Sequence, residues 1–348
     1  MGSCLIVVLL TLALTVSDGL ADGVRTQTPA ADYSRKSNVI YGQTFGVPLA
    51  MEVLTPVKSN GKGAVWIVSS NGVSTREQTL TASFERRVAP LLHHGYTVFA
   101  VIHRSSPNFQ VSDYIEDARR AVRFVRHNAE MFGVDGRRLG IAGSSSGGLI
   151  ALTVAMTGEE RNATANDPVE RESSRVQAAA SFFAPTDLMN VGETTENVVD
   201  WMQQRMGKVD PGFQFHDVDA KTGVRTRITD RNRVLAAIRD VSPVTHVSAG
   251  DPPTLLIHGD ADKAVPLRQS RLLMDRLNAA KVTARLVVRE GRGHAYQGWE
   301  ADSELIAEWF DEHVRGNARA KPPDVGASHT RARNATRDGR ADALPIGR

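Results

Sequence analysis

A single cysteine, Cys4, is present among the 348 residues. One thiol excludes an intramolecular disulfide framework, a zinc site built from cysteines and a thiol redox pair. Glycine and proline, with 29 and 15 residues, are at ordinary levels, which excludes collagen-like and low-complexity architectures. Hydrophobic residues make up 41% and charged residues 23%, which is typical of a folded protein. The length suits one large α/β domain or two ordinary domains.

A large excess of charge of either sign is also missing, because the net charge is only +3. Residues 315–348 contain eight Lys or Arg and three Asp, a net charge of +5, so the residues before them carry −2. The positive charge therefore belongs to the tail, and we expect no nucleic-acid binding by the fold. The tail has almost no apolar content, which predicts a disordered basic segment over 315–348. We hypothesise that this segment binds anionic surfaces or polymers.

The N-terminus carries an apolar segment that is too short to span a bilayer comfortably. Residues 5–16 are apolar or threonine, and the small residues Gly19 and Ala21 follow them. This pattern predicts a secretory signal peptide over 1–21, a secreted or periplasmic location, and no stable membrane insertion after cleavage. The segment before the apolar run lacks Lys and Arg, so an uncleaved N-terminal anchor is the alternative. Cys4 precedes the run, which argues against lipoprotein attachment.

Beyond a polar linker over 22–37, extended segments at 38–41 and 48–56 predict an N-terminal hairpin. Strands and helices then alternate, which predicts an α/β fold with a mostly parallel central sheet and helices on both faces, within one domain over 38–314. A polar stretch at about 190–240 interrupts the alternation and is interpreted as a lid-like insertion. The expected strands are 64–68, 97–102, 138–142, 178–183, 254–258 and 285–289, and the expected helices are 84–93, 111–131, 149–156, 270–277 and 304–314.

The sharpest local motif is Gly143-Ser144-Ser145-Ser146-Gly147, a G-x-S-x-G between an expected strand and an expected helix. The central serine of such a turn is held in a strained conformation, so the residues two before and two after it must be small. The turn lifts the Ser145 hydroxyl above the sheet and leaves the Ser146 N–H at a helix start, where it can donate to an oxyanion. Taken alone, the motif also suits an ordinary loop or a phosphate cradle.

A serine nucleophile needs a histidine base, and that base needs an acid to orient it. This fold class places them in the chain order Ser, then Asp or Glu, then His, at the carboxyl edge of the sheet. Two loops that follow expected strands supply both, with Asp262 in 258–262 and His294 in 291–294. The sequence therefore predicts a Ser145–Asp262–His294 triad. From the residues alone, however, Asp260 of the same loop is an alternative for the acid.

From about residue 38 to 314 the chain resembles the α/β-hydrolase esterases, especially secreted bacterial acetylxylan and feruloyl esterases and lipase/esterase-type hydrolases. The segment HGDADKAVP (258–266) matches the family's H-G-x-x-D-x-x-V-P, which assigns the acid to Asp262, and GRGH (291–294) matches its histidine loop. The resemblance implies an α/β-hydrolase fold and a serine esterase that acts through an acyl-enzyme. It also implies a small-molecule or polysaccharide-linked ester substrate, such as an acylated carbohydrate, and no metal or organic cofactor.

The chain departs from this family at one loop. Esterases of this kind usually carry His-Gly-Gly-Gly after the third strand, and Ser69-Ser70-Asn71-Gly72 stands here instead. Backbone donors survive a change of side chain, so we expect an oxyanion hole formed by Ser146, Asn71 and Gly72; loss of one donor costs about 2.7–4 kcal/mol in the barrier. The departure leaves a non-catalytic hydrolase-fold binding protein as one alternative. A prolyl-oligopeptidase-like serine peptidase is another, although the chain is too short for that group's gating domain.

Other candidate residues have simpler explanations. Asp187 follows an expected strand and is interpreted as a loop brace, although it also competes as the triad acid. His258 is interpreted as a structural histidine at a strand end. The histidines at 93, 94 and 103 lack the spacing of metal ligands, so no metal site is expected. The aromatic residues at 201–215 suit either contacts with the substrate or packing of the insertion.

Overall fold

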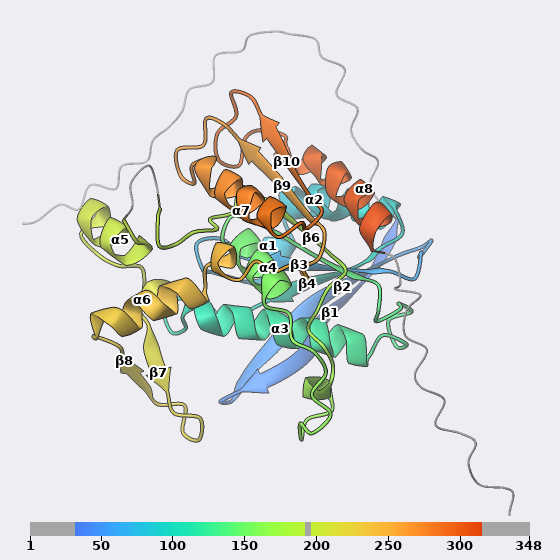
Figure 1. The fold of residues 1–348 in the computed structure, drawn as a ribbon. Coiled ribbons are helices and arrows are strands. Elements are labelled where there is room, and N and C mark those ends of the chain that lie inside the picture. Colours follow the sequence, from blue (N-terminus) through green and yellow to red (C-terminus); the bar gives the residue numbers. More distant parts are fainter. Residues whose placement is uncertain (1–31, 192–195, 315–348) are drawn as a thin grey trace, which may run out of the picture.

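The computed structural model describes residues 32–191 and 196–314, and a sheet of eight strands lies at its centre (Figure 1). These strands are β1 (Tyr33–Thr44), β2 (Val47–Pro56), β3 (Gly63–Val68), β4 (Thr97–Ile102), β5 (Leu139–Ser144), β6 (Ala178–Phe182), β9 (Thr254–Gly259) and β10 (Ala284–Arg289). Their order across the sheet is β1-β2-β4-β3-β5-β6-β9-β10. β2 is antiparallel to β1 and to β4, and all other neighbouring pairs are parallel. The mostly parallel sheet is therefore confirmed.

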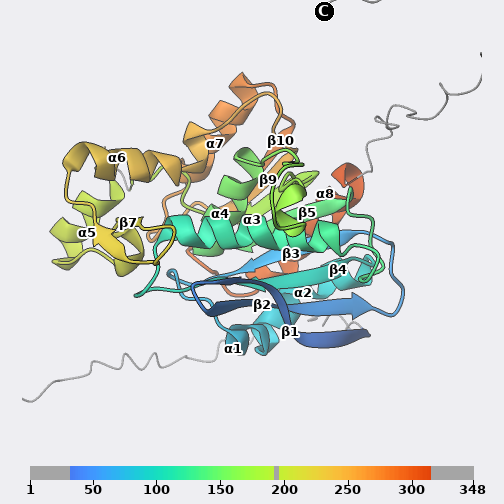
Figure 2. The ribbon, with the colours of Figure 1, turned by 90° about the horizontal axis from the view of Figure 1, so that it is seen from below.

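Helices cover both faces of this sheet (Figure 2). They are α1 (Arg76–Thr79), α2 (Ala82–His93), α3 (Val111–His127), α4 (Ser146–Met156), α7 (Arg268–Ala279) and α8 (Ser303–His313). Alternate residues of β3 belong to two different cores: Val65 and Ile67 to the core that also contains residues of α3, α4 and α7, and Trp66 to the core that also contains residues of α2 and α8. Because both faces are buried, all six residues of β3 are apolar or glycine and fully enclosed. The chain has the α/β-hydrolase architecture that the sequence predicted.

The N-terminal hairpin is present, but its first strand is longer than expected. β1 begins at Tyr33, so residues 33–36 pair with 53–56 of β2 and the predicted linker over 22–37 overlaps a strand. The sequence pattern did not predict this part of the strand because its side chains are polar. Arg35, for example, reaches the buried carboxylate of Glu52 instead of filling an apolar core. The helix predicted over 111–131 ends at His127, and a turn with Gly133 at φ +64° follows it.

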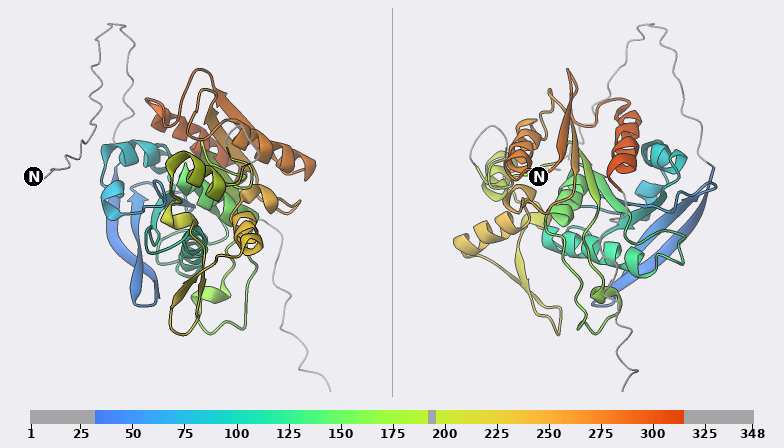
Figure 3. Two further views of the ribbon diagram at one scale, coloured as in Figure 1. Left: turned by 90° about the vertical axis from the view of Figure 1, so that its left-hand side faces the viewer. Right: turned by 45° about the vertical axis from the view of Figure 1, so that its right-hand side comes forward.

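The insertion at about 190–240 has a structure of its own (Figures 1 and 3). It contains α5 (Val198–Met206), the short 3₁₀ helix η2 (Pro211–Phe213), an antiparallel ribbon of β7 (His216–Val218) and β8 (Arg225–Arg227), and α6 (Arg231–Asp240). Three buried residues, Val198, Phe215 and Ile238, attach it to the apolar core. The remaining 3₁₀ helices are η1 (Val169–Arg171), η3 (Pro243–Thr245) and η4 (Trp299–Asp302).

Several expectations fall on residues outside the described part of the chain. They are the signal peptide over 1–21 and the basic tail over 315–348, together with residues 192–195 of the insertion. Within 32–191 and 196–314, none of the helices combines the length and apolar character that crossing a membrane requires.

Candidate active site

Ser145 stands between β5 and α4 with φ +52° and ψ −121°. This backbone conformation is costly for a residue with a side chain and persists only where the surroundings impose it. The Ser145 N–H donates to the Phe182 carbonyl at 2.9 Å, which ties the turn to β6. A Cβ on Gly143 would lie 2.3 Å from the Gly147 carbonyl oxygen, and one on Gly147 would lie 2.6 Å from that of Ile67. Both flanking positions therefore require glycine, as the motif predicted.

The structure brings Ser145, His294 and Asp262 together in one hydrogen-bond chain. His294 Nε2 lies 3.1 Å from the Ser145 Oγ, and His294 Nδ1 lies 2.7 Å from the Asp262 Oδ2. The three residues come from the loops after β5, β9 and β10, which end at the same edge of the parallel sheet. Such an arrangement lets the imidazole take a proton from the serine while the carboxylate holds its tautomer.

Backbone and side-chain donors surround the Asp262 carboxylate. The N–H groups of Ala264 and Val265 each donate to Oδ1 at 2.9 Å, and His258 Nε2 lies 3.4 Å from Oδ2. Burial would raise the pKa of Asp262, but hydrogen bonds from His258, His294 and Val265 outweigh it, so its pKa lies well below the usual range. The carboxyl group is therefore ionised at neutral pH, as an orienting acid requires.

The other two candidate carboxylates have different partners. Asp260 accepts the Gly291 N–H at 2.7 Å, which ties the loop after β9 to the loop that carries the histidine. Asp187 accepts the Met189 N–H at 3.0 Å and the Asn190 amide at 2.9 Å, within its own loop. Both contacts are braces, which agrees with the interpretation of Asp187 made from the sequence.

His258 is fully buried at the end of β9. Its Nδ1 lies 2.7 Å from the Ser270 Oγ and its Nε2 lies 2.8 Å from the Val265 carbonyl oxygen. These bonds join β9 to the start of α7 and to the loop of Asp262. The side chain therefore has the structural role that the sequence suggested, and it also supports the acid.

The segment that replaces the family's His-Gly-Gly-Gly is a tight turn beside the serine. Ser70 and Val73 exchange two backbone hydrogen bonds of 2.9 Å, and the residues between them, Asn71 and Gly72, have φ +49° and +73°. Asn-Gly with two positive φ values is the preferred pair for such a two-residue loop. The Ser146 hydroxyl donates to the Ser69 Oγ at 3.1 Å, which joins this turn to the first residue of α4. Because the sequence predicts oxyanion donors at Asn71 and Gly72, we call residues 69–73 the oxyanion turn.

Two aromatic side chains at the site gave no signal in the sequence for the contacts they make. Phe183 follows β6 at φ +35°, and its ring centroid lies 4.5 Å from that of His294. Tyr114, on α3, lies beside the oxyanion turn, where a Cβ added at Gly72 would be 3.4 Å from its ring. Both side chains lie beside segments that are far apart from them along the chain, so no local sequence pattern predicts this proximity.

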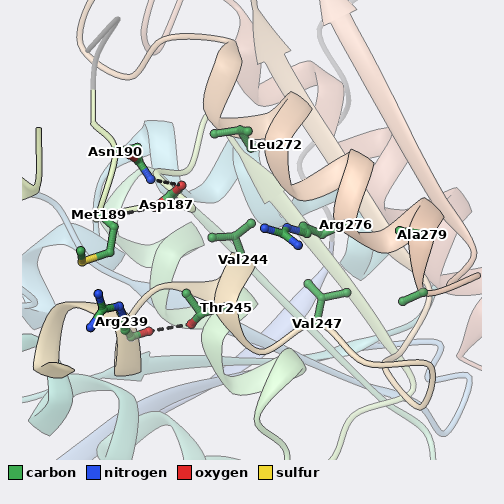
Figure 4. A pocket seen from close by; sticks show the side chains of 11 residues that line it. Asp187, Met189, Asn190, Arg239, Val244, Thr245, Val247, Leu272, Arg276 and Ala279 are labelled. Atoms are coloured by element: carbon green, nitrogen blue, oxygen red, sulfur yellow. Dashed lines mark hydrogen bonds between the residues drawn. The ribbon is translucent and has the colours of Figure 1, made fainter. Parts of the chain in front are cut away.

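A cavity of about 580 Å³ lies away from this hydrogen-bond chain (Figure 4). Its lining comes from the loop after β6, from α6, from η3 with the segment that follows it, and from α7, and includes Asp187, Arg239 and Arg276. None of Ser145, Asp262 and His294 lines it. In the described residues there is also no group of three His, Cys, Asp or Glu side chains arranged to hold a metal ion.

Comparisons with known proteins agree with this geometry. The BD-FAE family model matches residues 51–277. A probable carboxylic ester hydrolase of Mycobacterium tuberculosis, LipM, is 29% identical over 197 residues, which cover 54% of this chain and 40% of that protein. Esterases LipC and LipQ of the same organism are 25% and 28% identical, with 46% and 44% of their lengths covered. The chain thus spans about half the length of the curated relatives it matches, or less.

Solved structures match over more of the chain. A carbohydrate esterase from gut microbiota, in truncated form, has a TM-score of 0.65 at 24% identity, covering 82% of this chain and 98% of that one. A butyrate-bound esterase of Thermogutta terrifontis has a TM-score of 0.59 at 23% identity, covering 82% and 94%. At this identity the likeness establishes a shared fold.

Proposed function

The chain belongs to the BD-FAE family, and from that membership we propose that it is a serine hydrolase that cleaves carboxylic esters. One observation carries the proposal: Ser145, at a strained turn above the sheet, hydrogen-bonds to His294, which hydrogen-bonds to an ionised Asp262. The relatives named as ester hydrolases support it.

In the proposed reaction, His294 Nε2 takes the proton of Ser145 as its Oγ attacks the ester carbonyl carbon. The oxygen of the tetrahedral intermediate accepts hydrogen bonds from the Ser146 N–H and from the N–H groups of Asn71 and Gly72. The alcohol leaves with the proton from His294, and an acyl-enzyme remains. Water, deprotonated by His294, then attacks the acyl carbon and releases the carboxylic acid and Ser145. Asp262 holds the tautomer of His294 and stabilises its charged form throughout.

For the substrate, we propose an ester of a short acyl group, with an acylated carbohydrate as the first class to examine. Support comes from two proteins of the same fold, one described as a carbohydrate esterase and one holding butyrate. The proposed steps use only side chains and backbone donors of this chain together with water, so we propose no metal or organic cofactor.

The test combines a fluorophosphonate probe, which labels an activated serine, with turnover of aryl acetates, aryl butyrates and dipeptide amides. We expect labelling of Ser145 and faster turnover of esters than of amides. Ser145→Ala removes the nucleophile and should lower kcat by about 10⁶-fold, whereas Ser144→Ala, which removes a neighbouring hydroxyl, should leave it within a few-fold.

Each alternative has its own outcome in this test. Faster turnover of amides than of esters would favour a prolyl-oligopeptidase-like peptidase. Absence of labelling and of turnover would favour a non-catalytic binding protein with a hydrolase fold.

Export by a signal peptide over 1–21 also remains a proposal, which rests on the apolar run at 5–16. The mass of the N-terminal peptide of the protein recovered from its producing cells tests it, since an intact Met1 in exported protein contradicts cleavage.

A further inference from the structure

Tyr114 is buried in the first turns of α3, with 2% of its surface exposed. Its hydroxyl donates to the Phe109 carbonyl at 2.7 Å, which fixes the ring relative to the loop before the helix. The His103 ring stacks on it at a centroid distance of 4.5 Å. Burial lowers the pKa of His103 to about 4, so this neighbour is uncharged at neutral pH. The tyrosine ring therefore has a single well-supported position.

One side of Tyr114 faces the oxyanion turn. A Cβ added at Gly72 would lie 3.4 Å from the Cε2 of the tyrosine and 3.5 Å from its hydroxyl oxygen, so the ring lies beside the turn with room for at most a methyl group between them. The Ser106 N–H also donates to the Gly72 carbonyl at 3.1 Å. The backbone at Gly72 has φ +73°, and these two neighbours, Tyr114 and Ser106, restrict the position of the turn.

The hydroxyl end of Tyr114 faces the insertion. A Cβ on Gly212, in η2, would lie 3.1 Å from the Tyr114 hydroxyl oxygen. An added methyl group at Gly212 would thus press on the hydroxyl, so the insertion lies close to the tyrosine. Tyr114 therefore separates two backbone segments, Gly72 of the oxyanion turn and Gly212 of the insertion.

The insertion is anchored to the same part of the fold. The Gln110 side chain bonds both backbone groups of His216, with its Oε1 2.6 Å from the N–H nitrogen and its Nε2 3.2 Å from the carbonyl oxygen. Arg225 donates to Asp113 at 2.7 Å. The Phe109 ring lies near both Arg104 and Arg225, at 5.1 and 5.0 Å from their guanidinium carbons. The ribbon of the insertion is therefore fixed against the start of α3.

From these contacts we propose that Tyr114 is a positioning residue that couples the insertion to the oxyanion turn. The inference rests on the proposed function, since the turn is taken to supply donors to the oxyanion. Tyr114 does not touch the reacting atoms. It sets the place of the Asn71 and Gly72 N–H groups, and the insertion in turn limits where Tyr114 can lie.

The first test compares Tyr114→Phe and Tyr114→Ala with Tyr96→Phe. Tyr96 is an equally buried tyrosine directly before β4, at the amino end of that strand, where its hydroxyl donates to Asp311 at 2.9 Å. A displacement of a catalytic group by about 1 Å can cost about 100-fold in rate. We expect kcat to fall about 10-fold in Tyr114→Phe and about 100-fold in Tyr114→Ala, with KM within about 2-fold, because the donors act on the transition state. Tyr96→Phe should keep kcat.

Affinity for an aryl trifluoromethyl ketone, which forms a tetrahedral adduct with the serine, should weaken by the same factor as kcat/KM. A merely structural role would lower the melting temperature of the Tyr114 and Tyr96 variants alike and would leave kcat and ketone affinity per folded molecule unchanged. That result overturns the proposal.

The second test examines coupling through Gly212→Ala, whose Cβ presses on the tyrosine hydroxyl. We expect this change to lower kcat in the wild-type background and to have little further effect in Tyr114→Phe, where the oxygen is gone. Additive effects of the two changes contradict coupling.

Amide hydrogen exchange of the peptide covering 69–73 gives a readout that does not depend on activity. It should rise in Tyr114→Ala and not in Tyr96→Phe. If the wild type proves inactive, the proposed function fails, and this exchange measurement alone decides whether Tyr114 positions the turn.

Discussion

The Asp262 side chain experiences two opposing effects. Its environment excludes water, which favours the neutral acid, while two backbone N–H groups and two imidazoles favour the anion. The hydrogen bonds prevail and the pKa is lowered. The neighbouring carboxylates at 260 and 187 lack any contact of this kind with His294 in the described residues, so the choice of acid follows from local donors.

We predict that Asp262→Asn lowers kcat by about 10⁴-fold, because an amide at this position favours the wrong tautomer of His294. Steady-state hydrolysis of an aryl acetate measures the effect. Asp187→Asn is the matched control and should keep kcat within a few-fold, since that carboxylate accepts hydrogen bonds from Met189 and Asn190 of its own loop. The opposite ranking would make Asp187 the acid.

At the scale of elements, a charged contact joins the C-terminal end of α2 to α8. His94, which follows α2, has Nδ1 2.6 Å from Asp311 and Nε2 2.7 Å from Glu304, both on α8. A ring that donates to two carboxylates must be protonated at both nitrogens. Burial would lower the pKa of His94, but the hydrogen bonds to Asp311 and Glu304 outweigh it, so its pKa is raised.

A raised pKa in the folded state stabilises the fold below the unfolded-state pKa, about 6.5 for histidine, and this contribution is lost as pH rises through the folded-state value. We therefore predict that His94→Gln costs about 1 kcal/mol of unfolding free energy near pH 5.5, a figure reduced for partial exposure, and little near pH 9. Urea denaturation at both pH values measures it.

The neighbouring, exposed His93 supplies the control for this measurement. His93→Gln should show no such difference between the two pH values. A cost for His94→Gln that is equal at both values would mean that packing, not charge, joins the helices.

At the scale of the whole molecule, charge divides between the folded domain and the segment that follows it. The net charge of +3 is the sum of −2 over residues 1–314 and +5 over 315–348. α8 ends at His313, and Val314 after it is fully buried in the core. The core therefore extends to the last described residue, directly before the basic segment.

We predict that deleting 315–348 abolishes binding to an anionic polymer such as heparin and leaves kcat unchanged, because the net positive charge lies in this segment. The binding of the full chain should weaken as salt is added, since salt screens interactions between charges. Elution from a heparin column at increasing ionic strength, beside ester turnover, tests this. Retention of the truncated chain at low salt would instead locate the basic surface on the fold.

Local motifs in the sequence determined the fold class and the three residues of the hydrogen-bond chain. The constraints behind them are short-range: a strained turn demands glycine at 143 and 147, and each catalytic loop directly follows a strand. Alternation of strands and helices likewise predicted the parallel sheet, since burial on both faces leaves continuous apolar strands.

Only the tertiary structure decided the features that depend on distant segments. The strand at 33–36 lacked an apolar pattern because a buried carboxylate at 52 receives its arginine. Either Asp260 or Asp262 fits the loop by spacing, and the 2.7 Å contact with His294 separates them. The ring contact of Phe183 with His294, and the closeness of Tyr114 to Gly72 and Gly212, bring together residues that are tens to more than a hundred positions apart. Such contacts leave no periodic trace along the chain, because they depend on how whole elements pack.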